Sequence, residues 1–294
     1  MGTAGPDNVV VGVDGSETTD GAVAWAAAYA ARTHSPLVLL GVVKRALWSF
    51  SSTATPGSVE GGKTHDAVED YLASAEAAAQ KAVPGIDVAR KILEGKVVDQ
   101  IVSESAGARL VVIGAHCTNG AADLILNDHV MGVVTGAHCP VLVWRHAPDG
   151  GKDRPVVVGV DESKSAPAAL EAAFGVAEAL HAPVDVAHVW ETDAAVGLGY
   201  AAGPVDWDLE HAMKTEQARQ LEALVAPVAA RHRRVHTSVV LADGGPAKKL
   251  VELSTTARVV VVGTDHGRVS GAILGSVAQN VVHHAKCPVL VARA

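Results

Sequence analysis

The chain contains the same pattern of residues twice, about half its length apart. The run Val9-Val10-Val11-Gly12-Val13-Asp14 returns as Val156-Val157-Val158-Gly159-Val160-Asp161, 147 positions later. The run Cys139-Pro140-Val141-Leu142-Val143 returns as Cys287-Pro288-Val289-Leu290-Val291, 148 positions later. This period exceeds the roughly 20–50 residues of a solenoid unit, so each copy should be a globular domain with its own core. The polar linker 146–155 puts the boundary near residue 150 and predicts domains 1–147 and 153–294.

Composition narrows the function classes. Hydrophobic residues make up 49% of the chain and aromatic residues only 3%, so the cores must be built from small and β-branched side chains. The net charge is −8 and no basic run of five or more residues is present, which argues against a nucleic-acid partner. The amino terminus lacks the pattern of a signal peptide and no apolar run reaches about 18 residues, so we expect no membrane partner. These features and three cysteines, an odd number, favour a cytoplasmic location with reduced thiols.

Each copy reads as alternating strands and helices. The opening Val-rich runs are typical of strands buried on both faces, and the Ala-rich segments 17–32 and 165–180 after them have apolar residues at helical spacing. Further helices are expected at 63–82 and 206–230, and surface loops over the carboxyl edge at 49–62 and 193–205. The remaining strands are predicted at 36–43, 87–93, 106–114, 140–144, 183–190, 236–241, 257–263 and 288–292. The fold class is therefore α/β: two tandem copies of an open, mostly parallel five-stranded sheet with helices on both faces.

The residues at the carboxyl ends of the predicted strands are candidates for ligand binding, because open parallel sheets bind ligands there. Asp14 and Asp161 follow the first strands, and Gly114 and Gly263 end the fourth strands. The segment after Gly263 is rich in glycine, carries the cations His266 and Arg268, and closes on Gly275-Ser276 before a helix from Val277. Glycine lets a ligand approach the backbone, Ser276 is placed to cap the helix, and free amides at a helix start attract anions. A strand-to-helix loop also needs glycine for purely structural reasons, so this loop alone is a weak signal.

The combination of motifs is more specific. A Val-Gly-Val-Asp strand end, a glycine loop and a terminal Cys-Pro-Val-Leu-Val strand occur in order in both halves. In this the chain resembles the universal stress protein family, and the duplication resembles its tandem two-domain members, which implies a Rossmann-like fold related to adenine nucleotide alpha hydrolases. In nucleotide-binding members the loop runs Gly, two residues, Gly, nine residues, then Gly before Ser or Thr. Here the middle glycine, Gly267, follows Gly263 after three residues and only seven residues precede Gly275, so the loop is one residue short.

The resemblance implies an adenine nucleotide, ATP with Mg²⁺, in the second half. Gly159 and Asp161 would meet the nucleoside, and Val189 would line the adenine pocket. The residues implied at the phosphates are Gly263, Gly267, Gly275, Ser276 and Val277, beside the cation Arg268. The weaker equivalents in the first half are Gly12, Asp14, Val42 and Gly114.

The first half has lost much of the loop pattern. Cys117 stands where the second glycine is expected, and Asn127-Asp128 stand where Gly-Ser is expected. A carboxylate about 4 Å from a phosphate charge is repelled by roughly 4 kcal/mol at an effective dielectric near 20. We therefore expect an intact fold and no triphosphate in the first half.

Other chemistries find less support. His116-Cys117 and His138-Cys139 lack a second donor pair at zinc-ligand spacing, and Cys139 and Cys287 read as small buried residues. Asp14 and Asp161 lack the preceding acidic pair of a phosphoacceptor, and neither a nucleophile elbow nor a P-loop is present. The sequence thus favours an ATP-binding stress-response regulator without fast catalysis. The alternatives are a scaffold that acts through unknown protein partners without nucleotide, and a slow ATPase.

Assembly can also be inferred from strand edges. The fifth strands, 140–144 and 288–292, would be exposed apolar edges if they stayed unpaired. We therefore expect the two halves to pair with each other through these strands. A further homodimer of the whole chain is implied by the family resemblance.

Overall fold

A computed structural model of the chain describes residues 7–16, 18–43, 65–115, 128–145, 153–190, 207–264 and 274–293. These residues fall into two compact units, 7–145 and 153–293. The elements of the first unit are β1 (Asn8–Gly12), α1 (Thr19–Thr33), β2 (Leu37–Val43), α2 (His65–Ala82), β3 (Val88–Glu94), α3 (Val97–Ser105), β4 (Ala108–Gly114), α4 (Asp128–Gly136) and β5 (Val141–Trp144). Those of the second unit are β6 (Val156–Val160), α5 (Ala166–Leu180), β7 (Val184–Trp190), α7 (Trp207–Arg231), β8 (Thr237–Asp243), α8 (Pro246–Leu253), β9 (Val259–Thr264), α9 (Ser276–His284) and β10 (Val289–Arg293).

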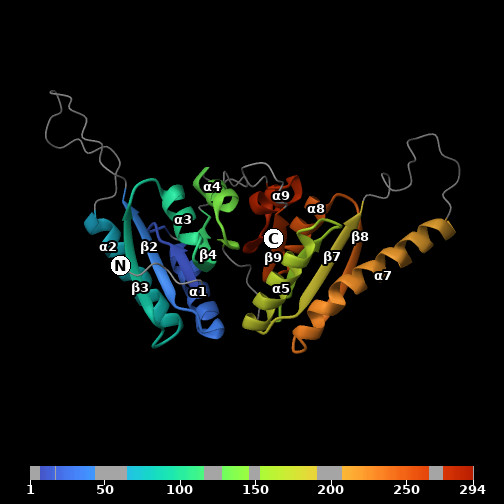
Figure 1. The fold of residues 1–294 in the computed structure, drawn as a ribbon, viewed down its shortest axis with the longest axis horizontal. Coiled ribbons are helices and arrows are strands. Elements are labelled where there is room, and N and C mark those ends of the chain that lie inside the picture. Colours follow the sequence, from blue (N-terminus) through green and yellow to red (C-terminus); the bar gives the residue numbers. More distant parts are fainter. Residues whose placement is uncertain are drawn as a thin grey trace, which may run out of the picture. The chain divides into compact units, whose positions relative to one another are not determined.

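Each unit contains a parallel sheet with the first strand of the repeat near its middle. The strand order is β3-β2-β1-β4-β5 in the first unit and β10-β9-β6-β7-β8 in the second. The chain winds outward in one direction through α1 and α2, and in the other direction through α3 and α4. Right-handed crossovers therefore place the two helix pairs on opposite faces, and α1 packs on α2 while α3 packs on α4 (Figure 1). The predicted fold class is confirmed.

The core of each unit consists of the Val-rich central strands and the small residues of the helices. Val9, Val10 and Val11 of β1 are fully buried, as a strand covered on both faces requires. On α1, buried alanines recur at helical spacing, and the helix ends at His34 in the left-handed conformation with φ 52°. Helix α5 ends in the same way at His181, also with φ 52°. The repeat is therefore preserved down to its helix-ending residue.

Element boundaries differ from the predictions by a few residues, and the sequence analysis gave no residue range for α3, α4 and α8. Helix α1 begins at Thr19 rather than at residue 17, and β8 and β9 extend to Asp243 and Thr264. Helices α3 and α8 fill the crossovers for which the sequence analysis named no residues. The segments 49–62 and 193–205 lie outside the described residues. The pairing of the fifth strands, the homodimer and the cytoplasmic location stay predictions.

Candidate functional site

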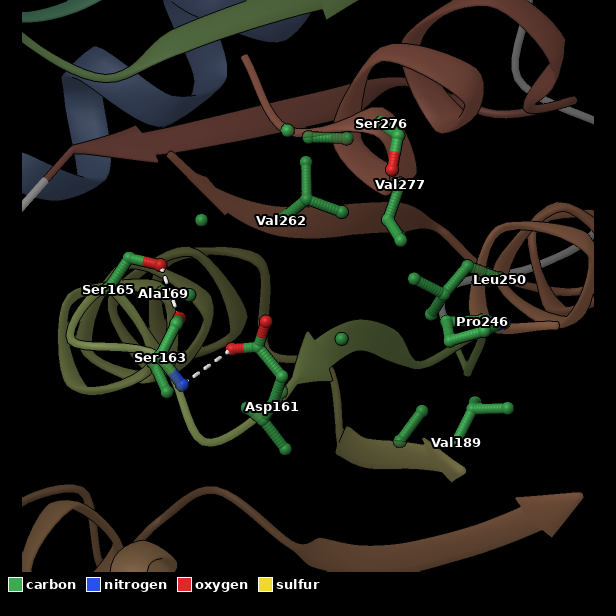
Figure 2. Close-up of a pocket in the computed structure, with 17 residues that line it drawn as sticks. Asp161, Ser163, Ser165, Ala169, Val189, Pro246, Leu250, Val262, Ser276 and Val277 are labelled. Atoms are coloured by element: carbon green, nitrogen blue, oxygen red, sulfur yellow. Dashed lines mark hydrogen bonds between the residues drawn. The ribbon is translucent and has the colours of Figure 1, made fainter. Parts of the chain in front are cut away.

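The second unit has a cavity of about 260 Å³ at the carboxyl ends of its central strands. Its walls come from the ends of β6, β7 and β9, from the start of α9, and from the helices α5 and α8 (Figure 2). Seven residues that the sequence analysis assigned to the nucleotide line it together: Gly159, Asp161, Val189, Gly263, Gly275, Ser276 and Val277. The other two, Gly267 and Arg268, lie outside the described residues.

The loop between β6 and α5 holds the acidic side chain of the cavity. The Ser163 amide donates to Asp161 Oδ1 at 3.1 Å, as in a short Asx turn, and fixes the carboxylate at the strand end. The Ser163 and Ser165 hydroxyls lie 2.8 Å apart, which orders the rest of the loop. Figure 2 shows the second carboxylate oxygen of Asp161 turned away from Ser163. This oxygen can therefore accept a hydrogen bond from a ligand.

Two predicted glycines are required by packing against the rest of the unit. A Cβ atom on Gly159 would lie 2.7 Å from Leu250 Cδ1, so the absence of a side chain lets α8 approach the strand end. A Cβ atom on Gly263 would lie 2.6 Å from Ser165 Oγ, so this glycine makes room for the hydroxyl that lies against β9. Both residues line the cavity, but their first effect is to let other side chains form its walls.

The start of α9 corrects one prediction. Ser276 was expected to cap this helix, but α9 begins at Ser276, and Gly275 occupies the N-cap position without a side-chain cap hydrogen bond. The Gln279 amide donates to the Gly275 carbonyl at 2.9 Å, so the amides that precede Gln279 have no intrahelical acceptor. The Ser276 hydroxyl and these amides lie at the cavity wall, and free amides at a helix start attract anions.

Helix α8 contributes wall residues that the sequence analysis missed. Pro246 stands at its first turn, and Leu250, which is 3% exposed, faces the cavity one turn further on. The pair Gly244-Gly245 before a proline is a recognisable helix start, since proline is favoured in the first turn of a helix. That signal locates α8, but it does not reveal which strand end the helix covers. The cavity is also lined by residues that were not predicted, among them Ser163, Ser165, Ala166, Ala169, Ala187 and Val262.

The chemistry of the walls is mostly neutral. Within the described part of the chain, Asp161 is the single charged residue that lines the cavity. Val189, Leu250 and Pro246 give an apolar side, which suits a flat aromatic base. The amides at the start of α9 give a side suited to an anion. The cavity thus offers separate surfaces for a base, a hydrogen-bond donor and a negative charge.

The first unit places its equivalent residues in corresponding positions. Gly12 and Gly114 end β1 and β4, Val42 lies in β2, and Asp14 follows β1. A Cβ atom on Gly114 would lie 2.6 Å from Thr18 Oγ1, which mirrors the approach of Ser165 to Gly263.

Helix α4, which follows β4, starts with a charged residue, whereas its counterpart α9 starts with a neutral one. Asp128 is the first residue of α4, where Ser276 begins α9, so a carboxylate stands at this helix start. Cys117 and Asn127 lie outside the described residues.

Other possible sites are weaker in the part of the chain that the structure describes. It contains no group of three or more His, Cys, Asp or Glu side chains that could hold a metal ion. Cys139 and Cys287 are buried, and each thiol faces the carbonyl of the proline that follows at 3.4 Å. Among the described helices, none combines the length and the apolar character that crossing a bilayer requires.

Comparison with known proteins agrees with this architecture. A universal stress protein of Mycobacterium tuberculosis is 32% identical over 297 residues, which cover 97% of this chain and 96% of that protein. A second one from the same organism is 30% identical over 295 residues, with the same coverage. The solved structure of a universal stress protein from Archaeoglobus fulgidus covers 98% of both chains with a TM-score of 0.70 at 20% identity, which shows the shared fold.

The family assignment follows from the whole length of the chain. The sequence pattern of the universal stress protein family matches it twice, over residues 6–145 and 153–293, which are the two units of the structure. The chain belongs to the universal stress protein family, as a tandem member with two copies of its domain.

Proposed function

We propose that the second unit binds an adenine nucleotide, ATP together with Mg²⁺, and that the presence of the nucleotide acts as a signal in a stress response. The observation that carries this proposal is the gathering of seven predicted nucleotide residues around one cavity. They come from three strand ends and one helix start, which are distant in the sequence. A family motif preserved only for folding would not need to leave a cavity at this point.

Each wall of the cavity would have a distinct role. The base would lie against Val189 and Leu250, and Asp161 would accept a hydrogen bond from a hydroxyl or amino group of the nucleoside. The phosphates would lie at the start of α9, where the free amides and the Ser276 hydroxyl can donate to them. Mg²⁺ would be held mainly by phosphate oxygens and water, which is its usual mode of binding to nucleotides and needs few protein ligands.

The lining residues favour binding over rapid turnover. Among the described ones there is no histidine or lysine, so this part of the wall supplies neither a base of near-neutral pKa nor a cation for the leaving phosphate. We therefore propose that occupancy is the signal and that any hydrolysis is slow.

The test is a pair of nearly isosteric substitutions at the helix start. Ser276→Asp copies the chemistry of Asp128, and Ser276→Asn has the same shape without the charge. Repulsion of roughly 4 kcal/mol between a carboxylate and a phosphate about 4 Å away corresponds to a loss of affinity on the order of a thousandfold. Calorimetry with ATP and Mg²⁺ should show this loss for Ser276→Asp and a much smaller one for Ser276→Asn. Thermal stability should hardly change, because an acidic residue in the first turn of a helix is favourable.

The rival functions give different results in a simple preparation. Native protein, purified without added nucleotide and extracted for mass spectrometry, should release an adenine nucleotide. A chain that carries none and also shows no heat of binding with ATP would favour the scaffold function. Steady conversion of added ATP to ADP, lost in Ser276→Asp, would favour the slow ATPase.

A further inference from the structure

The two copies of the repeat treat their strand-end carboxylate differently. In the first unit, Asp14 Oδ1 accepts two hydrogen bonds at 3.0 Å, one from the Ser16 amide and one from the Thr19 hydroxyl. In the second unit, Asp161 Oδ1 accepts the amide of Ser163, the counterpart of Ser16, and no hydroxyl takes the place of Thr19 among the described residues. The counterpart of Thr19, 147 positions later, is Ala166, whose methyl group cannot donate.

The residue at this position is closely packed in both units. Thr19 is 5% exposed and Ala166 is 3% exposed, and both begin the first helix of their unit. Ala166 also lines the cavity, beside Asp161 and Ser163. The first unit shows that the fold accommodates a β-branched residue with a hydroxyl here. The difference between the units is therefore a chemical one at an equivalent place.

We propose that residue 166 determines whether Oδ1 of the strand-end carboxylate is available to a ligand, in addition to the oxygen that is turned away from Ser163. Ala166 leaves Asp161 one donor short of the arrangement in the first unit, and the nucleoside supplies the missing donor. Thr19 supplies that donor internally in the first unit and holds Asp14 in the loop. The absence of a hydroxyl at position 166 is thus a determinant of nucleotide binding, in addition to the loop before α9. This inference rests on the proposed function, because it names a further residue that controls the same site.

A second contact in the first unit acts in the same direction. The ring of Tyr71 on α2 lies against Gly15, where a Cβ atom would be 2.5 Å from the ring. Gly15 follows Asp14 directly, so an aromatic side chain packs on the loop that holds this carboxylate. The residue equivalent to Gly15 in the second unit is Glu162, which is exposed. The loop of the first unit is therefore tied by Thr19 and covered by Tyr71.

The experiment compares three substitutions at position 166 in the full chain. Ala166→Ser and Ala166→Thr introduce the hydroxyl, and Ala166→Val introduces the volume of threonine without it. ATP affinity is measured by calorimetry in the presence of Mg²⁺, and the melting temperature of each variant is recorded. A hydrogen bond to a charged group has a net value equivalent to roughly a tenfold change in affinity. The Ala166→Ser and Ala166→Thr variants should therefore bind ATP about tenfold more weakly than Ala166→Val, although serine is the smallest of the three introduced side chains.

The order of affinities separates chemistry from size. If affinity falls with side-chain volume, so that Ser binds best and Thr and Val bind alike, the inference is wrong and Ala166 only provides space. If the two larger variants are unstable, Ala166→Cys replaces Val as the control, because Cys is close to Ser in shape but is only a weak donor; Ala166→Ser must then bind ATP more weakly than Ala166→Cys, and equal affinities would overturn the inference. Thr19→Ala is the control in the first unit and should leave the affinity of the wild-type second unit unchanged. Absence of ATP binding by the wild type would instead overturn the proposed function, and this inference with it.

Discussion

The substitution Gly159→Ala tests how the cavity wall is held in place. The added methyl carbon would lie 2.7 Å from Leu250 Cδ1 and 3.2 Å from Cδ2, whereas carbon atoms in contact prefer about 3.5–4.0 Å. Leu250 is 3% exposed and belongs to α8, which packs on β6 and β7, so either its side chain must turn into the cavity or the helix must shift. Overpacking of this kind lowers the free energy of unfolding by about 1–3 kcal/mol. Replacing glycine by alanine also reduces the conformational entropy of the unfolded chain, which offsets about 0.4–1 kcal/mol of this loss. We expect the second unit to lose about 1–2 kcal/mol of its free energy of unfolding.

Gly12→Ala is the matched control at the same position of the repeat. There the new carbon would lie 3.4 Å from Ile101 Cδ1 and 3.4 Å from Ile113 Cγ2, which needs shifts of only tenths of an ångström. The first unit should therefore change its stability by less than about 1 kcal/mol.

Hydrogen exchange read by mass spectrometry reports each unit separately, and protection of residues 246–253 should fall in Gly159→Ala alone. Equal losses in both variants would refute the reasoning from the Leu250 contact. Intact protection in Gly159→Ala combined with lost ATP binding would show that Gly159 is needed by the ligand instead.

Two further predictions concern charge and backbone strain. Burial raises the pKa of Asp185 in β7, against a lowering by the nearby His236, so the folded chain binds this proton more tightly than the unfolded chain. Asp185→Asn should therefore raise the free energy of unfolding at pH 7. This gain in stability should shrink as the pH falls through the pKa of folded Asp185 toward the pKa of about 4 in the unfolded chain. A gain that does not depend on pH would contradict this. Gly15 and Gly85 have φ of 73° and 80°, but only Gly15 meets a side chain, the ring of Tyr71. In thermal melts, Gly85→Ala should lower the free energy of unfolding by the roughly 1–2 kcal/mol of strain that a positive φ imposes, and Gly15→Ala should lower it further. Equal losses of stability in the two variants would argue against the contact with the Tyr71 ring.

The sequence predicted those parts of the site that depend on local patterns. Asp161 follows a Val-rich strand, and Gly275-Ser276 precede a helix, so each could be assigned from its neighbours along the chain. The duplication helped, because every motif could be checked against its second copy. The same reasoning placed Val189 at the end of its strand, where it lines the cavity.

The parts that were missed depend on contacts between distant segments. Leu250 reaches the cavity because α8 crosses the end of β6, a matter of tertiary packing that no local pattern encodes. Thr19 differs from Ala166 by a hydroxyl whose importance appears only once its distance to Asp14 is known. Ser276 was given the wrong position in its helix, because a glycine and a serine in sequence can each serve as the N-cap.

We propose that one unit binds ATP and the other does not. The most direct measurement is calorimetric titration of the full chain with ATP and Mg²⁺, because it gives the number of sites along with the affinity. We predict one site per chain, removed by Ser276→Asp and retained in an Asp14→Asn variant of the first unit. Two sites per chain, no heat of binding, or a single site that Asp14→Asn removes and Ser276→Asp leaves intact would contradict the account.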